Sequence, residues 1–542
     1  MNAGGATSTD SPFPRLSLLA VAVIALLALP PFFSLLAAAL TTPGALSEAW
    51  QAVTQEPRLV HLGLRSVQVA VLSALWATCL GLPSAWVLCR WSPFGRTILA
   101  GLLILPALIP PYLLAMGWHG LLGPIGSLRG DGPQWLMMLL KGGRLYTPCG
   151  VAFVMGCYTS PLVIVTVSAT LLATDRGAEE AARIYRGRLG GMWAVTAKPA
   201  CTALLVAALL VMLVCMGEYS VPSLYQVNVF SIEIHTRISA FCDINGATVL
   251  SLPLLFPTCL AMVLLYCTTG ALRCNQLTLT PARLPRTRWR TLGALWCLAV
   301  INVSLLFPLA ALAWHTAALR SLGQAIRTCA PQIGHSVLVA AATATLTSIL
   351  GFLLAFILHQ ATPRMRITAQ VLSLPALLLP GTLHGLGIIR LWNRPGPCGW
   401  LYGTPGILVV AYLGRYLAVA LLPGLHAMRR IPRALAEAAR THGLPASRIA
   451  TGIYLPLLSR AFGLSWLLVF ALTIAELNIA ILLAPPGFST LGVRLFTLLH
   501  YGMNTMVAAI ALILTAVGMG PLISVLLIDS LRRTAKHARH HL

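Results

Sequence analysis

The chain has 542 residues, of which 58% are hydrophobic and only 9% are charged. A soluble domain carries about 25% charged residues, so this composition excludes a soluble globular protein and indicates an integral membrane protein. The formal net charge of +24 does not indicate a nucleic-acid-binding protein, because the basic residues gather in short segments between long apolar runs.

The apolar runs are long enough to cross a membrane as helices, since roughly 20 helical residues span a hydrocarbon core of about 30 Å. The sequence predicts an all-α membrane protein with about twelve transmembrane helices and membrane lipid around it. Lys and Arg are concentrated in alternate connecting segments, which places both termini in the cytoplasm by the positive-inside rule. The predicted spans are 16–40, 63–89, 97–120, 147–172, 199–222, 247–270, 293–317, 335–358, 367–392, 405–426, 456–484 and 505–530.

The first predicted span could instead be a cleaved signal peptide. Its apolar run from Leu16 to Leu40 is longer than the apolar core of such signals, which is about 7–15 residues, and only Arg15 precedes it. We therefore expect this span to stay in the protein.

An internal repeat divides the chain. Residues 66–88 parallel 336–358, with Ser66 matching Ser336. Each half has six predicted spans, and because six is even, both halves enter the membrane from the same side and form parallel repeats. The sequence also aligns Phe230 with Phe488. The predicted organisation is a first repeat at 1–272, a basic cytoplasmic linker at 273–290 and a second repeat at 291–542.

A charged, punctuated segment interrupts each half, at 174–199 in the first and at 432–456 in the second. In the second, Glu437 lies early in a short helix, where a carboxylate meets the positive end of the helix dipole. Gly443 is a natural helix stop, and a turn at Leu444-Pro445 leads into the next span. One such helix would be an ordinary solvated loop helix, but two at matching places favour a docking element for a cytoplasmic partner.

Two carboxylates, Glu218 and Glu476, lie late in apolar spans at matching positions. A charged side chain near the middle of a bilayer costs roughly 2.5–3.5 kcal/mol. Either the two form an acidic pair that faces a translocation path near its outer mouth and attracts a cation, or each is an end-of-span carboxylate satisfied by backbone N–H groups or a nearby Arg. Arg415 is another candidate for a buried charge, as a structural partner or as a substrate contact.

The second charged segment resembles the EAA motif of permease subunits in binding-protein-dependent ABC importers. It matches the motif at Glu437, Ala438, Ala439, Gly443, Ile453, Leu455 and Pro456. The first segment keeps Glu180, Ala181, Ala182 and Pro199, but Arg186 occupies the glycine position and Gly187 follows one residue late. The resemblance implies that these residues form coupling helices that dock on an ATPase subunit.

The resemblance extends over most of the chain and narrows to fused permeases of ferric-iron importers, on the segments 105–118, 217–241 and 475–502. It implies the type I ABC importer permease fold in a bacterial inner membrane, two ATPase subunits beneath it, and a periplasmic binding protein that delivers the substrate. Fused permeases for thiamine are similar, and permeases for polyamines and aminoethylphosphonate share the fold.

The chain itself is predicted not to be an enzyme. Its three Lys residues, at 141, 198 and 536, do not follow Gly, so the motif G-x-x-x-x-G-K-[ST] is absent and ATP is expected on the partner subunit, with no cofactor on this chain. No spacing of Cys or His indicates a metal site. A secondary transporter also commonly has two six-span halves, but it needs carboxylates or His well inside the membrane, which most spans here lack. A non-transporting membrane scaffold is the remaining alternative.

Overall fold

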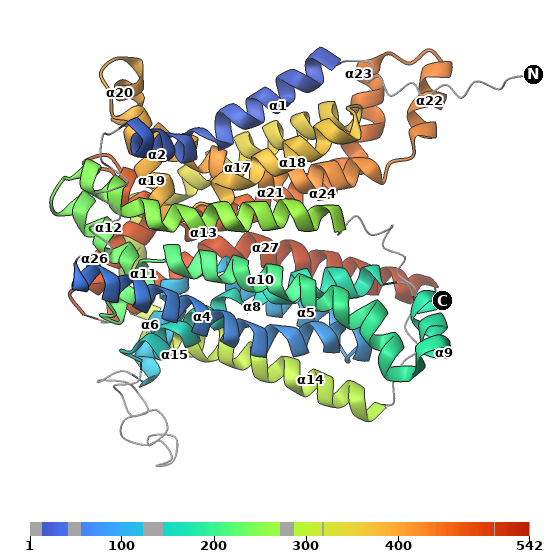
Figure 1. The fold of residues 1–542 in the computed structure, drawn as a ribbon, viewed down its shortest axis with the longest axis horizontal. Coiled ribbons are helices and arrows are strands. Elements are labelled where there is room, and N and C mark those ends of the chain that lie inside the picture. Colours follow the sequence, from blue (N-terminus) through green and yellow to red (C-terminus); the bar gives the residue numbers. More distant parts are fainter. Residues whose placement is uncertain are drawn as a thin grey trace, which may run out of the picture.

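The computed structural model describes residues 14–41, 56–122, 145–174, 176–271, 287–316, 319–502 and 505–540. Every regular element within these ranges is a helix, and the helices run roughly along the long axis of the molecule (Figure 1). The predicted linker at 273–290 lies outside the described residues except for its last four, which begin a helix.

The first half contains four long helices and several short ones. Its elements in chain order, with the π-helical and 3-10 turns marked η, are α1 (Pro14–Ala28), α2 (Pro30–Thr41), α4 (Pro57–Trp86), η1 (Val87–Trp91), α5 (Arg96–Ile104), η2 (Leu105–Leu108), α6 (Pro111–Leu122), α8 (Pro148–Ala173), α9 (Arg176–Met192), η3 (Trp193–Ala197), α10 (Lys198–Gly217), α11 (Ser220–Leu224), α12 (Phe230–Ser239) and α13 (Ile244–Ala271).

The second half repeats this plan. Its elements are α14 (Thr287–Ile301), η4 (Asn302–Leu306), α15 (Phe307–Thr316), α16 (Leu319–Thr328), α17 (Ala330–His359), α18 (Pro363–Leu378), α19 (Gly381–Trp392), α20 (Pro397–Tyr402), α21 (Gly406–Arg429), α22 (Arg433–Thr441), α23 (Ala446–Ile449), η5 (Ala450–Tyr454), α24 (Leu455–Ala475), α25 (Ala480–Leu483), α26 (Leu491–Leu499) and α27 (Thr505–His540).

Within the described residues, eight helices are long and apolar enough to cross a membrane, and three bent pairs raise the number to at most eleven. The chain is therefore a multi-pass membrane protein. The predicted span 247–270 falls in α13, of which Ile244–Leu260 counts as a shorter apolar helix. Twelve spans remain a prediction.

Three predicted spans are not straight. The first bends by 57° between α1 and α2, the third by 96° before α6, and the ninth by 100° between α18 and α19. Each break comes at proline, which lacks an N–H for the helix and crowds the residue before it. In the two sharp bends the chain changes direction at Pro110-Pro111 and at Pro380-Gly381, so each of the predicted spans 97–120 and 367–392 is either one broken span or a re-entrant loop.

The two halves share one internal hydrogen bond that marks their equivalence. Ser66 Oγ accepts a hydrogen bond from Phe230 N at 2.8 Å, at the start of α12, and Ser336 Oγ accepts one from Leu491 N at 2.7 Å, at the start of α26. Leu491, rather than Phe488, is thus the counterpart of Phe230. The sequence alignment missed this shift because it followed the aromatic residue rather than the start of the helix.

Each half sends its first helices across to the other half. α1 packs on α18, and α2 packs on α19, where Ser34 Oγ donates to Gly387 O at 3.1 Å. In return, α14 packs on α5 and η1, and α15 packs on α6. Trp296 Nε1 donates to Ser84 Oγ at 3.1 Å across this second contact. The boundaries of the sequence repeat are therefore not the boundaries of two separately packed bodies.

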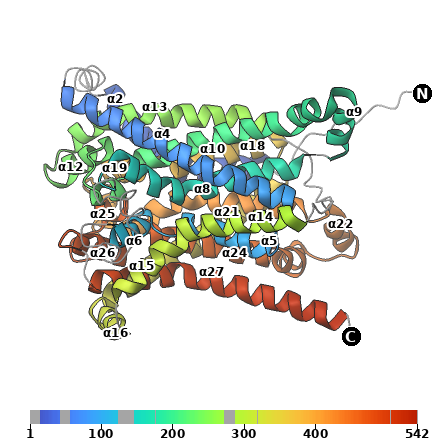
Figure 2. The same ribbon diagram turned by 90° about the horizontal axis from the view of Figure 1, so that it is seen from below.

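The charged segments lie at one end of the bundle. α9 lies there with α22 and α23, and the start of α1 and the end of α27 lie at the same end (Figure 1). We call this end the charged end. The short helices α12, α20 and α26 lie at the opposite end. Seen from below, α13 runs along one edge of the bundle and α27 along the other (Figure 2).

Candidate coupling segments and inter-half gate

The first charged segment is a helix with a sharp internal turn. α9 is interrupted at Gly187, which has φ 70° and ψ 174°. Glu180 and Ala181 are exposed, and Ala182 is half-buried. Past the turn, η3 leads into α10, whose exposed Pro199 lies in the first helical turn. The segment therefore presents its motif residues to the outside of the bundle.

Glu179, which precedes the motif glutamate, anchors this segment. Glu179 is 7% exposed, and its Oε2 accepts a charge-assisted hydrogen bond from Arg90 Nη1 at 3.0 Å. Arg90, in η1 at the end of α4, also donates through Nη2 to Thr196 Oγ1 of η3 at 3.4 Å. One arginine thus connects α4 to both sides of the turn. The Glu179-Glu180 doublet is the only sequence signal for this arrangement.

The second charged segment folds as two short helices joined by a turn. α22 ends near His442, Gly443 has φ 74°, and α23 and η5 lead into α24. Glu437 and Ala438 are exposed, like their counterparts in the first segment, and Leu455 is 63% exposed beside the exposed Pro456.

Apolar contacts anchor the second segment where the first uses an ion pair. Ala439 and Ile449 are buried against one another, with Ile453 and Tyr454 packed on them. The Tyr454 ring meets the Phe356 ring of α17 edge to face, with centroids 5.4 Å apart. Because α17 is the counterpart of α4, the two segments are held by equivalent helices, the first through an ion pair and the second through apolar contacts.

The two glycines occupy the same backbone position. Gly187 and Gly443 both have left-handed φ, a region that L residues other than Asn and Asp rarely adopt. A Cβ built on either glycine would meet no heavy atom within 4 Å, so the backbone conformation and not lack of space requires glycine. The first helix simply continues one residue further before it turns. The sequence comparison placed Arg186 at the position of the turn glycine. In the structure the turn glycine is Gly187.

The carboxylates Glu218 and Glu476 occupy matching positions where α10 and α24 end. Each is the first residue with extended backbone after its helix, with φ/ψ of −81°/128° and −78°/116°. Glu218 is 7% exposed and the Glu476 side chain is 10% exposed, so neither faces an open channel in this structure.

Glu218 is the carboxylate that contacts both halves. Its Oε1 accepts hydrogen bonds from Ser220 N, at 2.9 Å, and from Ser220 Oγ. Its Oε2 accepts from Asn478 Nδ2 of the second half at 3.3 Å. No salt bridge to Glu218 occurs among the described residues, and its partners are neutral groups.

Glu476 is neutralised within its own half. Its Oε2 lies 3.5 Å from Arg415 Nε and accepts from Tyr416 Oη at 3.0 Å. Arg415 also donates through Nη1 to Leu379 O, just before the sharp turn between α18 and α19, at 2.8 Å. This arrangement supports the structural reading of Arg415. The counterpart of Arg415 in α8 is Tyr158, so the first half offers no equivalent cation.

The sharp turn at Pro380-Gly381 packs directly on this site. A Cβ on Gly217, next to Glu218, would lie 2.3 Å from Pro380 Cβ, and one on Gly381 would lie 3.1 Å from Glu476 Oε1. We call Glu218, Glu476, Asn478, Arg415 and the Pro380-Gly381 turn the inter-half gate. Several buried polar atoms in or beside it have no hydrogen-bond partner within the described part of the chain, among them Arg415 Nε, Asn478 Oδ1, Thr382 Oγ1 and Tyr412 Oη.

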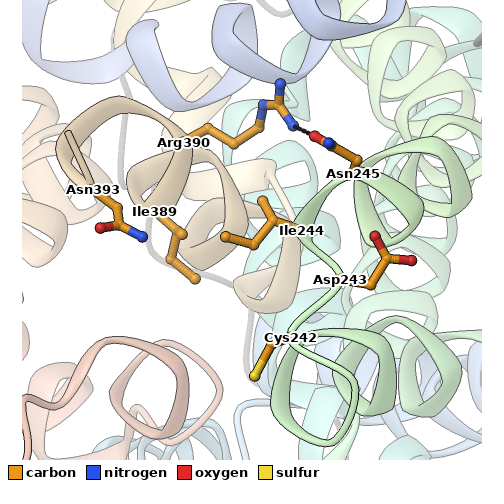
Figure 3. Close-up of a pocket in the computed structure, with 7 residues that line it drawn as sticks. All are labelled: Cys242, Asp243, Ile244, Asn245, Ile389, Arg390 and Asn393. Carbon is orange, nitrogen blue, oxygen red and sulfur yellow. Dashed lines mark hydrogen bonds between the residues drawn. The ribbon is translucent and has the colours of Figure 1, made fainter.

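A polar pocket lies at the opposite end from the charged segments, between α13 of the first half and α19 of the second (Figure 3). Arg390 Nη1 donates across it to Asn245 Oδ1 at 3.1 Å and to Thr248 Oγ1 at 3.0 Å. These bonds connect the last turn of α19 to α13 of the other half. Neither this contact nor the role of Asn478 could be predicted from the sequence, because both depend on which helices meet.

Among the described residues, no three His, Cys, Asp or Glu side chains lie close enough together to hold a metal ion.

Known proteins similar to this chain are membrane components of transport systems. The putrescine transport system permease protein PotI of Escherichia coli is 31% identical over 198 residues, which cover 34% of this chain and 68% of PotI. A probable molybdenum ABC transporter permease protein of Haloferax volcanii is 31% identical over 155 residues, 28% of this chain and 54% of that protein. This chain belongs to the ABC transporter permeases. No protein-family model matches the permease.

A shorter match adds a third relative. The molybdenum transport system permease protein ModB of Haemophilus influenzae is 41% identical over 64 residues, which cover 11% of the permease and 28% of ModB. As a permease, the chain is a transport component rather than a catalyst. One of these relatives is named for putrescine and two are named for molybdenum, so family membership leaves the substrate of this permease open.

Proposed function

We propose that this permease forms the complete membrane pathway of a bacterial inner-membrane importer that carries a cation. Its twelve spans would form two parallel six-helix repeats, the type I importer fold, with both termini in the cytoplasm. Two ATPase subunits would dock on the charged segments, and a periplasmic binding protein would deliver the substrate at the opposite end. The observation that carries this proposal is the location of both segments at one end of a helical bundle with a carboxylate gate between its halves.

The coupling role is supported by exposed surface at the charged end. Ile184 and Tyr185, just before the turn of the first segment, are 84% and 91% exposed. Leu435 and Leu444 of the second segment are 46% and 39% exposed. Large apolar side chains on the tips of polar loops favour a protein partner over solvent. The motif residues Glu180 and Glu437 lie on these same tips.

The cation specificity is supported by the charge of the gate. Arg415 neutralises Glu476, whereas the partners of Glu218 are the neutral Ser220 and Asn478, so the gate carries one net negative charge when both carboxylates are ionised. A buried carboxylate without a cation partner is costly, and a passing cation would relieve that cost. Ferric iron is the substrate that the resemblance of 475–502 favours.

A polyamine is the second candidate, because the similarity to PotI covers 68% of that putrescine permease. A divalent organic cation also suits a gate with one unpaired carboxylate. Molybdate, an oxyanion, would meet like charge at Glu218 and is the poorer fit.

The proposal is tested by reconstituting the permease with its ATPase in liposomes and supplying loaded binding protein. Ferric iron, putrescine, thiamine and molybdate are compared for uptake and for stimulation of ATP hydrolysis. We expect stimulation by one of the cations and none by molybdate. Stimulation by molybdate would overturn the cation assignment, and uptake without ATP would overturn the importer assignment.

A further inference from the structure

A second pocket lies at the charged end of the second half, between α21 and α24 and against the start of α22. It encloses about 530 Å³. Its walls are mainly apolar, with Leu457, Leu464 and Leu468 along α24. Its charged or titratable lining residues are His426, Arg430 and Arg460, and none of the lining residues is acidic.

An apolar cluster adjoins the pocket. Behind it, Phe352 of α17 packs with Met428, Ile431 and Leu458 in a buried apolar cluster. His426 lies eleven residues after Arg415 on α21, which is three helical turns, so both side chains point in nearly the same direction. The pocket therefore lies on the side of α21 that carries the gate arginine, toward the charged end.

The basic residues of the pocket are not a general property of this end of the molecule. The positive-inside rule accounts for basic residues near the ends of spans, but it predicts them equally in both halves. At the repeat spacing, the first-half counterparts of His426, Arg430 and Arg460 are alanines, at 169, 173 and 203. The same helices in the first half thus form the same scaffold without the charges.

A ligand for this pocket needs an anionic group and an apolar body. Arg430 and His426 are exposed at the mouth of the pocket, whereas the leucines of α24 extend from the mouth along the helix. Basic pockets between transmembrane helices on the cytoplasmic side are suited to anionic lipid head groups.

We propose that this pocket binds an anionic phospholipid of the cytoplasmic leaflet. The phosphate lies between Arg430 and Arg460, and the upper part of an acyl chain lies along Leu464 and Leu468. Pro432 and Leu435, at the start of α22, also line the pocket, so the lipid contacts the second charged segment directly. Lipid binding then supports the position of the second segment and not that of the first.

The test uses the purified permease–ATPase complex in phosphatidylcholine nanodiscs with and without phosphatidylglycerol, and bound lipid is counted by native mass spectrometry. The inference rests on the proposed orientation but not on the substrate, because binding is read without transport. Each surface arginine contributes about 1 kcal/mol to anionic lipid binding, so Arg430→Ala with Arg460→Ala should weaken phosphatidylglycerol binding about 25-fold.

Two controls separate this result from misfolding and from general charge. Arg429→Ala removes the neighbouring exposed arginine, which does not line the pocket, and should weaken binding less than the loss of either pocket arginine. Replacing both pocket arginines by Lys keeps the charge and should retain most of the binding. Equal loss in the Arg429 variant, or unchanged binding in the double alanine variant, would overturn the proposal.

A final arm distinguishes lipid from a soluble anion. Inorganic phosphate at millimolar concentration should not displace the bound phosphatidylglycerol, because it lacks the apolar body that the leucines contact. Displacement by phosphate would show a site for a free anion and would overturn the lipid assignment.

Discussion

The two charged segments are alike in backbone and different in what holds them. Both turn at a glycine with left-handed φ, and they are attached to equivalent helices, the first at η1 after α4 and the second at α17. The first is attached by the buried ion pair of Arg90 and Glu179, whereas Ala439, Ile449 and the Tyr454–Phe356 contact attach the second. The turn is thus the shared requirement, and the anchor is free to vary. The gate shows the same pattern, with matching carboxylates and an arginine in one half alone.

The largest expected effect comes from removing a turn. Gly443→Arg places a bulky charged side chain at a left-handed position inside the proposed docking surface. It should lower transport at least about 30-fold, as expected for a residue at the centre of an interface, while the protein still inserts. Because Gly187 also has positive φ at the turn of its segment, Gly187→Arg should cost a similar factor. Substrate-stimulated ATPase activity in liposomes is the measurement.

Alanine variants separate the turn from the bulk of the arginine. Gly443→Ala imposes only backbone strain, about 1–2 kcal/mol, and Gly452→Ala is the control because Gly452 has ordinary φ and open space around it. If the Gly187→Arg variant keeps wild-type transport activity while the Gly443→Arg variant loses it, the first segment does not dock through its turn.

The gate should respond unequally to loss of its two carboxylates. Glu218→Gln removes the charge that no cation balances, and uptake of a cation should fall about tenfold or more, the range for a charged hydrogen-bonding group. Glu476→Gln should also slow uptake, because it leaves Arg415 without its ion pair. The double variant should lose less than the two single losses combined, since groups in one site are non-additive.

Uptake is measured at saturating binding protein, with ATP hydrolysis recorded alongside. Tyr416→Phe is the matched control, because it removes one hydrogen bond to Glu476 and no charge. If both single Gln variants transport at the wild-type rate, the carboxylates are structural and the argument for a cation is lost.

The anchor of the first segment should be sensitive to charge and that of the second should not. Glu179→Gln leaves Arg90 partly buried without its ion pair, which should raise amide hydrogen exchange in α9 about tenfold. Arg90→Gln should have the same effect, and the double variant should be no worse than either single one. Gln360 stands at the position of Arg90 in the second half, so Gln360→Ala is the control and should leave exchange in α22 unchanged.

The smallest expected effect concerns the contact across the gate. Asn478→Ala removes one hydrogen bond to Glu218, worth about 1 kcal/mol, and should slow uptake about fivefold or less. Asn478→Asp is more informative, because it adds a second negative charge beside Glu218. Faster uptake of an anion by that variant would contradict the cation assignment.

The sequence alone determined the class of the protein and the location of its charged segments. A composition this poor in charged residues is typical of a membrane protein. The EAA-like motif, repeated at Glu180 and Glu437, is visible in the sequence itself. Glu218 and Glu476 were also evident, because a carboxylate in an apolar run is costly and therefore conspicuous.

The tertiary structure decided which of these residues act together. It exchanged α1 and α14 between the halves, bent two predicted spans by 96° and 100°, and placed Asn478 of one half on Glu218 of the other. An apolar run predicts that a helix lies inside the membrane. Lipid chains and neighbouring helices are equally apolar, so hydropathy does not distinguish a helix face that contacts lipid from one that contacts another helix. Close packing at residues such as Gly217 and Pro380 makes that choice, and it is a property of two segments that are distant in the sequence.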